Sequence, residues 1–394
     1  MPPRHRWPLL LAVLLAACTG TPPSATPSPS SIRTAPAPTA SAKAPEGTPI
    51  SPPAPTTSAP IPGEVPPVQV YLHYYTWWTL QHWHEKLGRA YPYAAATLPL
   101  PATVDASGCA PRAEYPGATI ADLPSEGLYD QGQAATFDRH IAAAAAAGIT
   151  GFLVSWQGIG TVSQTPDSSG YDSRLELLVE RVDAYNAIHA VPFRLGLAFA
   201  AFGEYSRPAA EIIGDLTYFS TRYGHDPAFA DTFSSKPLVM WLDSRKINLA
   251  TVQAVSAALR PSLYLIGDET YQTWSRDAPY LDASSYYWST QNPYQNASSG
   301  AQVLSLASQV RASDARWFAP FIAGYDKVLA GGSCVPRNGV ETLDRLWQLN
   351  GASHPDAWFG ISWNEFVEGT YLEPTVRYGR TSLDELRRLI FAAG

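Results

Sequence analysis

Two glutamates, Glu365 and Glu368, stand three residues apart near the C-terminus. Hydrolysis of a glycosidic bond needs two carboxyl groups, one as an acid and one as a base or nucleophile. Positions i and i+3 face opposite sides of a continuing strand but share one face of a helical turn. The two side chains therefore converge only if the preceding strand stops near Asn364, and Gly369 is consistent with a turn there. The alternative is a pair of acids that are merely solvated in a loop.

Strand-like and helix-like segments alternate along the chain before and after this pair. The strand-like runs are apolar, β-branched or aromatic and cover residues 68–75, 151–156, 193–199, 237–243, 263–268, 282–288, 316–322 and 357–363. The helical patterns cover residues 133–147, 171–189, 209–223, 248–259, 271–276, 300–312, 340–349 and 382–394. Eight strands alternating with about eight helices indicate a closed (β/α)8 TIM barrel. An open doubly wound sheet is the alternative, although no glycine-rich phosphate loop follows the first strand.

Two local features extend this prediction. Ser382 and Glu385 have the spacing of a capping box, which predicts that the last helix begins there. The stretch from Thr76 to about residue 130 is rich in proline and glycine, and we expect a long irregular segment with a covering or functional role.

Polar and aromatic residues follow the predicted strands, where a barrel of this kind has its active site. Aromatic rings can cover the apolar face of a sugar, and carboxylates and amides can bind its hydroxyl groups. The candidates for substrate contacts are Tyr75, Trp78, Trp156, Glu204, Tyr287, Tyr325 and Asn364, beside the candidate catalytic pair Glu365 and Glu368. A single residue of these types more often has a structural role than a binding role. The prediction of a sugar site therefore rests on the occurrence of such residues at the ends of all eight strands.

Other chemistries find less support in the sequence. The net charge of -7 argues against a nucleic-acid partner, because no basic stretch could replace the counterions of phosphates. No Gly-x-Ser-x-Gly or His-Glu-x-x-His motif is present. His82 and His84 stand two residues apart, which is weak evidence for a metal site. We therefore expect neither a metal nor a cofactor.

The N-terminus has the pattern of a secretory signal. Arg4 and Arg6 precede an apolar run from Leu9 to Ala17 that is too short to span a membrane. The sequence Leu-Ala-Ala-Cys that ends at Cys18 resembles the bacterial lipoprotein box, which implies cleavage before Cys18 and acylation of its sulfur. This predicts a lipid-anchored protein on the extracellular face of the bacterial cell membrane. The alternative is an ordinary cleaved signal beside an incidental cysteine.

The composition divides the chain into three parts. Residues 1–17 are the predicted signal, and residues 18–67 are rich in Pro, Ala, Ser and Thr, which predicts a disordered tether. Residues 68–394 are long enough for one barrel domain, which we expect to be monomeric. With Cys18 lipidated, Cys109 and Cys334 remain and are expected to form a disulfide in an oxidising compartment, with two free thiols as the alternative.

Several of these segments resemble glycoside hydrolase family 99, the endo-α-mannosidase family. The most specific is the motif from Asn364 to Pro374, and weaker similarities occur in the same order along the chain. These weaker segments are residues 74–77, 148–156, 218–227, 236–239 and 324–326. The resemblance covers most of residues 70–378.

The resemblance implies a (β/α)8 barrel that cleaves α-mannosidic links inside a polysaccharide or oligosaccharide with retention of configuration. Glu368 resembles the family's general acid. Glu365 resembles the base that removes the proton of the sugar 2-hydroxyl and so gives a 1,2-anhydro intermediate. These roles require a protonated Glu368 and an ionised Glu365, so their surroundings must separate the two pKa values.

The chain departs from the family at three positions. Phe366 and Val367 stand where Trp and His are usual, and Gln157 stands where a second Trp is common. These departures leave two alternatives to an α-mannanase. One is a glycosidase of the same fold that acts on another α-linked polymer, such as an α-glucan. The other is a glycan-binding surface lipoprotein without catalytic activity.

Overall fold

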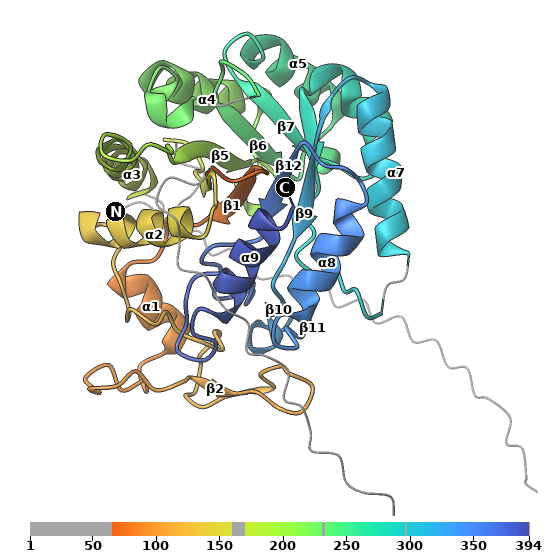
Figure 1. Ribbon diagram of the computed structural model, residues 1–394. Coiled ribbons are helices and arrows are strands. Elements are labelled where there is room, and N and C mark those ends of the chain that lie inside the picture. The colour runs from red at the N-terminus through yellow and green to blue at the C-terminus, as the bar shows by residue number, and fades with distance from the viewer. Residues whose placement is uncertain (1–64, 160–169, 231–232, 296–297, 394) are drawn as a thin grey trace, which may run out of the picture. The chain divides into compact units, whose positions relative to one another are not determined.

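Eight parallel strands form a closed barrel in a computed structural model, which describes residues 65–159, 170–230, 233–295 and 298–393 (Figure 1). Around the barrel the strand order is β1-β12-β9-β8-β7-β6-β5-β4. The strands are β1 (Val70–Tyr74), β4 (Gly151–Ser155), β5 (Arg194–Ala200), β6 (Leu238–Leu242), β7 (Tyr264–Asp268), β8 (Ala283–Ser285), β9 (Arg316–Phe321) and β12 (Ala357–Gly360). The predicted (β/α)8 barrel is therefore confirmed, and the open sheet is excluded.

The first and last strands close the barrel. Val70 of β1 pairs with Trp358 of β12, and Tyr71 of β1 pairs with Gly151 of β4. Both faces of these strands are buried, which explains why the sequence shows continuous apolar runs rather than a strict alternation of apolar and polar residues. Residues that follow β1 and residues that follow β12 consequently meet at the same end of the barrel.

Eight helices cover the outside of the barrel in the described part of the chain (Figure 1). They are α2 (Ala134–Ala146), α3 (Tyr171–Asn186), α4 (Ala209–Tyr223), α5 (Leu249–Leu259), α6 (Trp274–Asp277), α7 (Ser299–Ala312), α8 (Glu341–Gly351) and α9 (Thr381–Phe391). In α3, which corresponds to the predicted helix at residues 171–189, Leu175, Leu178 and Val182 are fully buried and form one apolar face. None of the helices in the described ranges is long and apolar enough to cross a membrane.

The predicted capping box of α9 is wrong. The helix begins at Thr381, and Arg380 is its N-cap residue without a side-chain hydrogen bond. Ser382 lies inside the first turn, where its hydroxyl accepts a hydrogen bond from the buried Arg337 at 3.1 Å. The Ser382 side chain thus bonds to a residue from elsewhere in the fold and does not cap the helix.

The segment after β1 is less irregular than expected. It contains α1 (Leu80–Leu87) and a short antiparallel pair, β2 (Ala102–Thr103) and β3 (Arg112–Ala113). The Thr79 side chain caps α1 by accepting a hydrogen bond from His82 N at 3.2 Å. Trp83 of α1 is buried in a cluster with aromatic residues of the loop after β12. This segment therefore packs beside the two glutamates.

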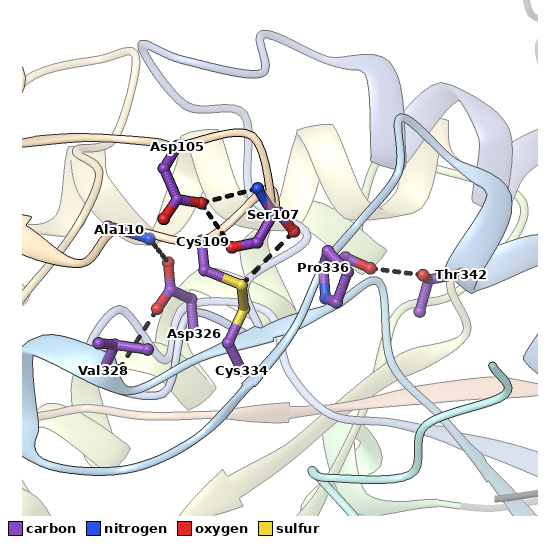
Figure 2. The surroundings of a disulfide bond; sticks show 9 residues. All are labelled: Asp105, Ser107, Cys109, Ala110, Asp326, Val328, Cys334, Pro336 and Thr342. Carbon is purple, nitrogen blue, oxygen red and sulfur yellow. Dashed lines mark hydrogen bonds between the residues drawn. A yellow bond between two sulfur atoms is a disulfide. The ribbon is translucent and has the colours of Figure 1, made fainter. Parts of the chain in front are cut away.

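A second hairpin lies at the same end of the barrel as α1 and β2 (Figure 1). It consists of β10 (Tyr325–Asp326) and β11 (Cys334–Val335), joined through the 3-10 helix η6 (Val328–Ala330). The predicted disulfide between Cys109 and Cys334 is confirmed, with Cα atoms 6.2 Å apart. Figure 2 shows that the Ala110 N–H also donates to the Asp326 carboxylate, at 2.8 Å. The segment after β1 is thus tied to the hairpin after β9.

Candidate active site

Glu365 and Glu368 lie in one turn of the loop that follows β12. The strand ends at Gly360, and the chain turns through residues 366–369. Glu365 Oε1 accepts hydrogen bonds from the backbone N–H of Val367 at 2.8 Å and of Glu368 at 3.2 Å. The strand stops before the two glutamates, as their convergence requires, and it is three residues shorter than the predicted strand.

Gly369 allows this turn to approach the β10–β11 hairpin. Its φ angle is +64°, and a Cβ atom at this position would lie 2.9 Å from the backbone nitrogen of Asp326. That Asp326 N–H donates to the Glu368 carbonyl oxygen at 2.8 Å. A side chain at position 369 would therefore push the hairpin away from Glu368. The expected turn at this glycine is confirmed.

Asn364 joins the loop after β12 to the end of β1. Its Oδ1 accepts from Tyr75 N at 2.8 Å, and its Nδ2 donates to Tyr75 O at 2.9 Å. The Asn364 carbonyl oxygen also accepts from Trp78 Nε1 at 2.7 Å. These bonds hold Tyr75 beside the glutamates, so the amide side chain acts as a clamp between the first and last βα units.

A cavity of about 470 Å³ opens at the carboxyl ends of the strands beside the two glutamates. This volume is in the range of small-molecule sites. The cavity is lined by His73, Tyr75, Trp77, His82, Glu85, Lys86, Ser155, Gln157, Tyr171, Ala200, Tyr205, Leu242, Lys327, Glu365, Val367 and Glu368. These residues come from α1, from the strand ends, from Tyr171 of α3, from Tyr205, from the β10–β11 hairpin and from residues 365–369. We call residues 365–369 the catalytic turn because they contain the candidate catalytic pair. The wall thus combines aromatic rings with carboxylates and ammonium groups.

A chain of polar contacts surrounds the Glu368 carboxylate. Tyr287 donates its hydroxyl hydrogen to Glu368 Oε2 at 3.1 Å, and the Tyr75 hydroxyl lies 3.1 Å from that of Tyr287. Lys327 Nζ lies 3.3 Å from Glu368 Oε1. Burial, together with the charges of the glutamates, raises the pKa of both tyrosines well above the ordinary value. Both hydroxyls therefore remain hydrogen-bond donors at neutral pH.

The two glutamates differ in their surroundings. Glu365 is 3% exposed, and burial raises its pKa to about 8, with a further rise from the Glu368 charge. The backbone N–H groups and the Lys327 ammonium oppose this rise. The raised pKa favours a proton on Glu365, whereas the family resemblance implies an ionised Glu365.

Three of the predicted substrate contacts do not lie at the cavity. Asn364, Trp78 and Trp156 are fully buried. Trp78 stacks on Trp83 with ring centroids 3.9 Å apart, and Trp156 Nε1 donates to the Asp172 carboxylate at 3.2 Å. We correct the prediction for these three residues, because their polar atoms bond to other parts of the protein and their surfaces face the interior.

The other predicted contacts have different outcomes. Tyr75 lines the cavity, and Tyr287 bonds to the catalytic turn. Burial raises the pKa of Tyr325 to about 12, and the charges of Glu368 and Glu365 contribute, which places its hydroxyl near the pair. Glu204 belongs to the 3-10 helix η2 (Gly203–Tyr205), and its side chain lies outside the described part of the structure.

Sequence reasoning missed several residues of the cavity wall. Trp77 lines the cavity, is partly exposed and stacks on Tyr75 with ring centroids 4.2 Å apart. Lys327 had no signal in the sequence, because a lone lysine in a loop has no informative spacing. His73 is buried, and burial lowers its pKa to about 3, so a neutral imidazole lies under the Tyr75 ring at 4.2 Å.

One group in the described ranges could hold a metal ion, and it lies outside the cavity. It consists of Glu126, His140 and Glu373. His82 and His84 do not belong to it: His82 stacks on Trp77, and His84 stacks on Tyr93. The weak metal hypothesis for these two histidines therefore gains no support.

Neither a protein-family model nor a curated protein sequence matches the chain. Solved structures do match. Two structures of a glycoside hydrolase family 99 endo-α-mannosidase from Bacteroides thetaiotaomicron have TM-scores of 0.63 and 0.61 and sequence identities of 18% and 17%. Each covers 82% of this chain, and the chain covers 98% and 96% of them.

A third structure, described as a glycoside hydrolase-like protein, has a TM-score of 0.53 and 15% identity. It covers 68% of this chain, and 89% of its own length is matched. At these identities the likeness concerns the fold, and the chain shares the barrel fold of the family 99 endo-α-mannosidases.

Proposed function

We propose that this protein is a retaining glycoside hydrolase that cleaves α-mannosidic or related α-glycan links within a polymer. The observation that carries the proposal is the position of Glu365 and Glu368 in one turn at the edge of the 470 Å³ cavity. The family resemblance of this motif and the shared fold support the same conclusion.

The surroundings of the pair fit an acid and a base. Two interacting carboxyl groups titrate as a unit, and a pKa of about 8 at Glu365 means that the pair keeps one proton at neutral pH. The proposed role of Glu368 is to donate that proton to the leaving oxygen, which requires that the shared proton move from Glu365 to Glu368 when the substrate binds. The proposed role of Glu365 is to accept the proton of the sugar 2-hydroxyl. A carboxylate with a raised pKa is a stronger base for this step.

The departures from the family leave the identity of the sugar open. Phe366 is buried and stacks on Tyr371, so its change does not reach the cavity. Val367 and Gln157 both line the cavity. An apolar side chain at position 367 cannot bind a sugar hydroxyl as a histidine can. An α-glucan or another α-linked polymer is therefore tested beside α-mannan.

The experiment measures oligosaccharide release by residues 19–394, which lack the predicted signal and Cys18. We expect release from an α-linked polymer, and loss of release by at least 1,000-fold in Glu368→Gln, because amides cannot act as the acid. Glu180→Gln, an exposed residue of α3, is the matched control and should retain full activity. Release by Glu368→Gln at the wild-type rate would disprove the role of Glu368.

A glycan-binding protein without activity would behave differently. It would hold the polymer without releasing oligosaccharides, and Glu368→Gln would leave its affinity largely unchanged. If the wild type and Glu368→Gln both bind the polymer and neither releases oligosaccharides, the protein is a glycan-binding protein and not a hydrolase.

We further infer that Cys18 carries a lipid that anchors the protein on the extracellular face of the cell membrane. The support is the sequence pattern of residues 1–18, which lie outside the described residues. A disulfide is also common in oxidising compartments. Cys18→Ala should move the protein from the membrane fraction to the medium or the soluble fraction, and an unchanged membrane fraction would contradict the anchor.

A further inference from the structure

Behind the catalytic turn, three side chains with metal-ligand atoms meet from distant parts of the sequence. Glu126 precedes α2, His140 lies on α2, and Glu373 follows the catalytic turn. One ligand atom from each lies within 4.8 Å of the other two. The separation of these positions in the chain explains why the sequence predicts no metal site here.

Glu373 supplies a second observation that points to a cation. Its side chain is 2% exposed, and its Oε2 accepts a hydrogen bond from the Tyr129 hydroxyl at 2.9 Å. Its Oε1 has no hydrogen-bond partner and lies 3.7 Å from His140 Nε2. A buried carboxylate oxygen without a donor is uncommon, because its desolvation is not compensated.

His140 is oriented as metal-binding histidines usually are. Its Nδ1 lies 2.7 Å from the Tyr74 hydroxyl, an outer partner that can fix the ring. Its Nε2 lies 2.8 Å from Glu126 Oε1 and faces Glu373 as well. Two ligand atoms that each lie about 2.1 Å from a tetrahedral zinc ion stand about 3.4 Å apart. This separation lies between the distances from His140 Nε2 to Glu126 Oε1, 2.8 Å, and to Glu373 Oε1, 3.7 Å.

A hydrogen-bond network without a metal explains only part of this cluster. His140 Nε2–H can donate to Glu126, and the Arg139 guanidinium neutralises the Glu126 charge. Neither contact reaches Glu373 Oε1. A hydrogen-bond network alone leaves Glu373 Oε1 without a partner, whereas a bound cation would give this oxygen one.

We propose that Glu126, His140 and Glu373 bind a divalent metal ion, with Zn²⁺ as the expected ion. Imidazole nitrogen and carboxylate oxygen are both ligand types that zinc accepts, and water can take the remaining position. The Glu126 side chain is 21% exposed, which gives the ion a path from solvent. The ion connects α2 and the loop before it to the segment that follows the catalytic turn. Its role is structural, because the three residues do not line the cavity.

The test uses residues 19–394 without an affinity tag, treated with a chelator, dialysed and then supplied with Zn²⁺, Mn²⁺ or Ca²⁺. Bound metal is measured by elemental analysis and titration calorimetry, and the melting temperature is measured with and without each ion. We expect about one Zn²⁺ per chain and a higher melting temperature with Zn²⁺.

Two conservative variants make the test specific to the site. Glu126→Gln is partly exposed and should fold normally, and Glu373→Gln keeps the shape of the buried side chain. Each should weaken Zn²⁺ binding at least tenfold and abolish the Zn²⁺-dependent rise in melting temperature, whereas Glu180→Gln should change neither. If the wild type binds no more Zn²⁺ than the two variants, the site does not exist. Because these readouts do not involve hydrolysis, they are independent of the proposed activity.

Discussion

At the scale of single residues, the site depends on how differently Glu365 and Glu368 are placed although they are three positions apart. Both line the cavity, but Glu365 is buried and accepts two backbone N–H bonds, whereas Glu368 is half-buried and contacts Lys327 and Tyr287. The sequence identified the pair and the need for a turn. It could not show which glutamate is more buried, because burial is decided by residues far away in the chain.

The shared proton gives a pH dependence with a definite sign. Below a pH of about 8 the pair keeps the proton that the acid step needs, and above it the proton is lost. We therefore expect kcat/KM to fall about tenfold per pH unit above pH 8, measured with the expected polymer substrate at constant ionic strength. A rate that stays constant to pH 10 would contradict the raised pKa of Glu365.

The neighbouring tryptophans provide a matched pair of substitutions. Trp77 lines the cavity and stacks on Tyr75, so Trp77→Ala should raise KM about tenfold, which is about 1.4 kcal/mol of lost contact. Trp78 is fully buried, so Trp78→Ala should lower the free energy of unfolding by about 3–5 kcal/mol. Enzyme kinetics and denaturant unfolding distinguish the two effects. A stable Trp78→Ala protein with raised KM would restore the original prediction.

At the scale of elements, the apolar runs predicted all eight barrel strands close to their observed positions, because each strand is buried on both faces. The helix α1 was missed, since its eight residues carry mostly polar side chains and gain their support from the Trp83 cluster. The capping box failed because Arg337 engages Ser382. Local sequence patterns therefore predicted the strands that are buried along their whole length. They failed for elements whose contacts come from residues far away in the chain.

The β10–β11 hairpin carries Lys327 to Glu368, and this placement can be tested. Lys327 is 35% exposed, so the loss of its ion pair in Lys327→Met should lower kcat/KM only about fivefold, or about 1 kcal/mol. Its charge also lowers the pKa of Glu365, so the fall of activity with pH should begin at a higher pH in the variant. Lys327→Arg should restore the wild-type pH profile, and an unchanged profile in Lys327→Met would exclude this role.

At the scale of the whole molecule, one covalent bond joins positions 225 residues apart. In the chain-entropy description, closing a loop of this length stabilises the folded state by about 5 kcal/mol. The double variant Cys109→Ser, Cys334→Ser should therefore melt about 5–10 °C lower. Its kcat/KM should also fall, because the bond holds the hairpin that carries Lys327.

Controls can separate the bond from the substitutions themselves. Wild type treated with a reductant should approach the melting temperature of the double variant, and the reductant should not affect the variant. Equal melting temperatures for oxidised and reduced wild type would show that the disulfide does not stabilise the fold.

The pairing of β1 with β12 has a consequence for when the candidate site forms during synthesis of the chain. Tyr75 follows β1 and Glu365 follows β12, so the two come together only when the first and last barrel strands pair. A nascent polypeptide that lacks β12 has an unclosed sheet and contains neither Glu365 nor Glu368. The proposed hydrolysis can therefore begin only after β12 and the turn that follows it have been synthesised, and a chain that ends before β12 should be inactive.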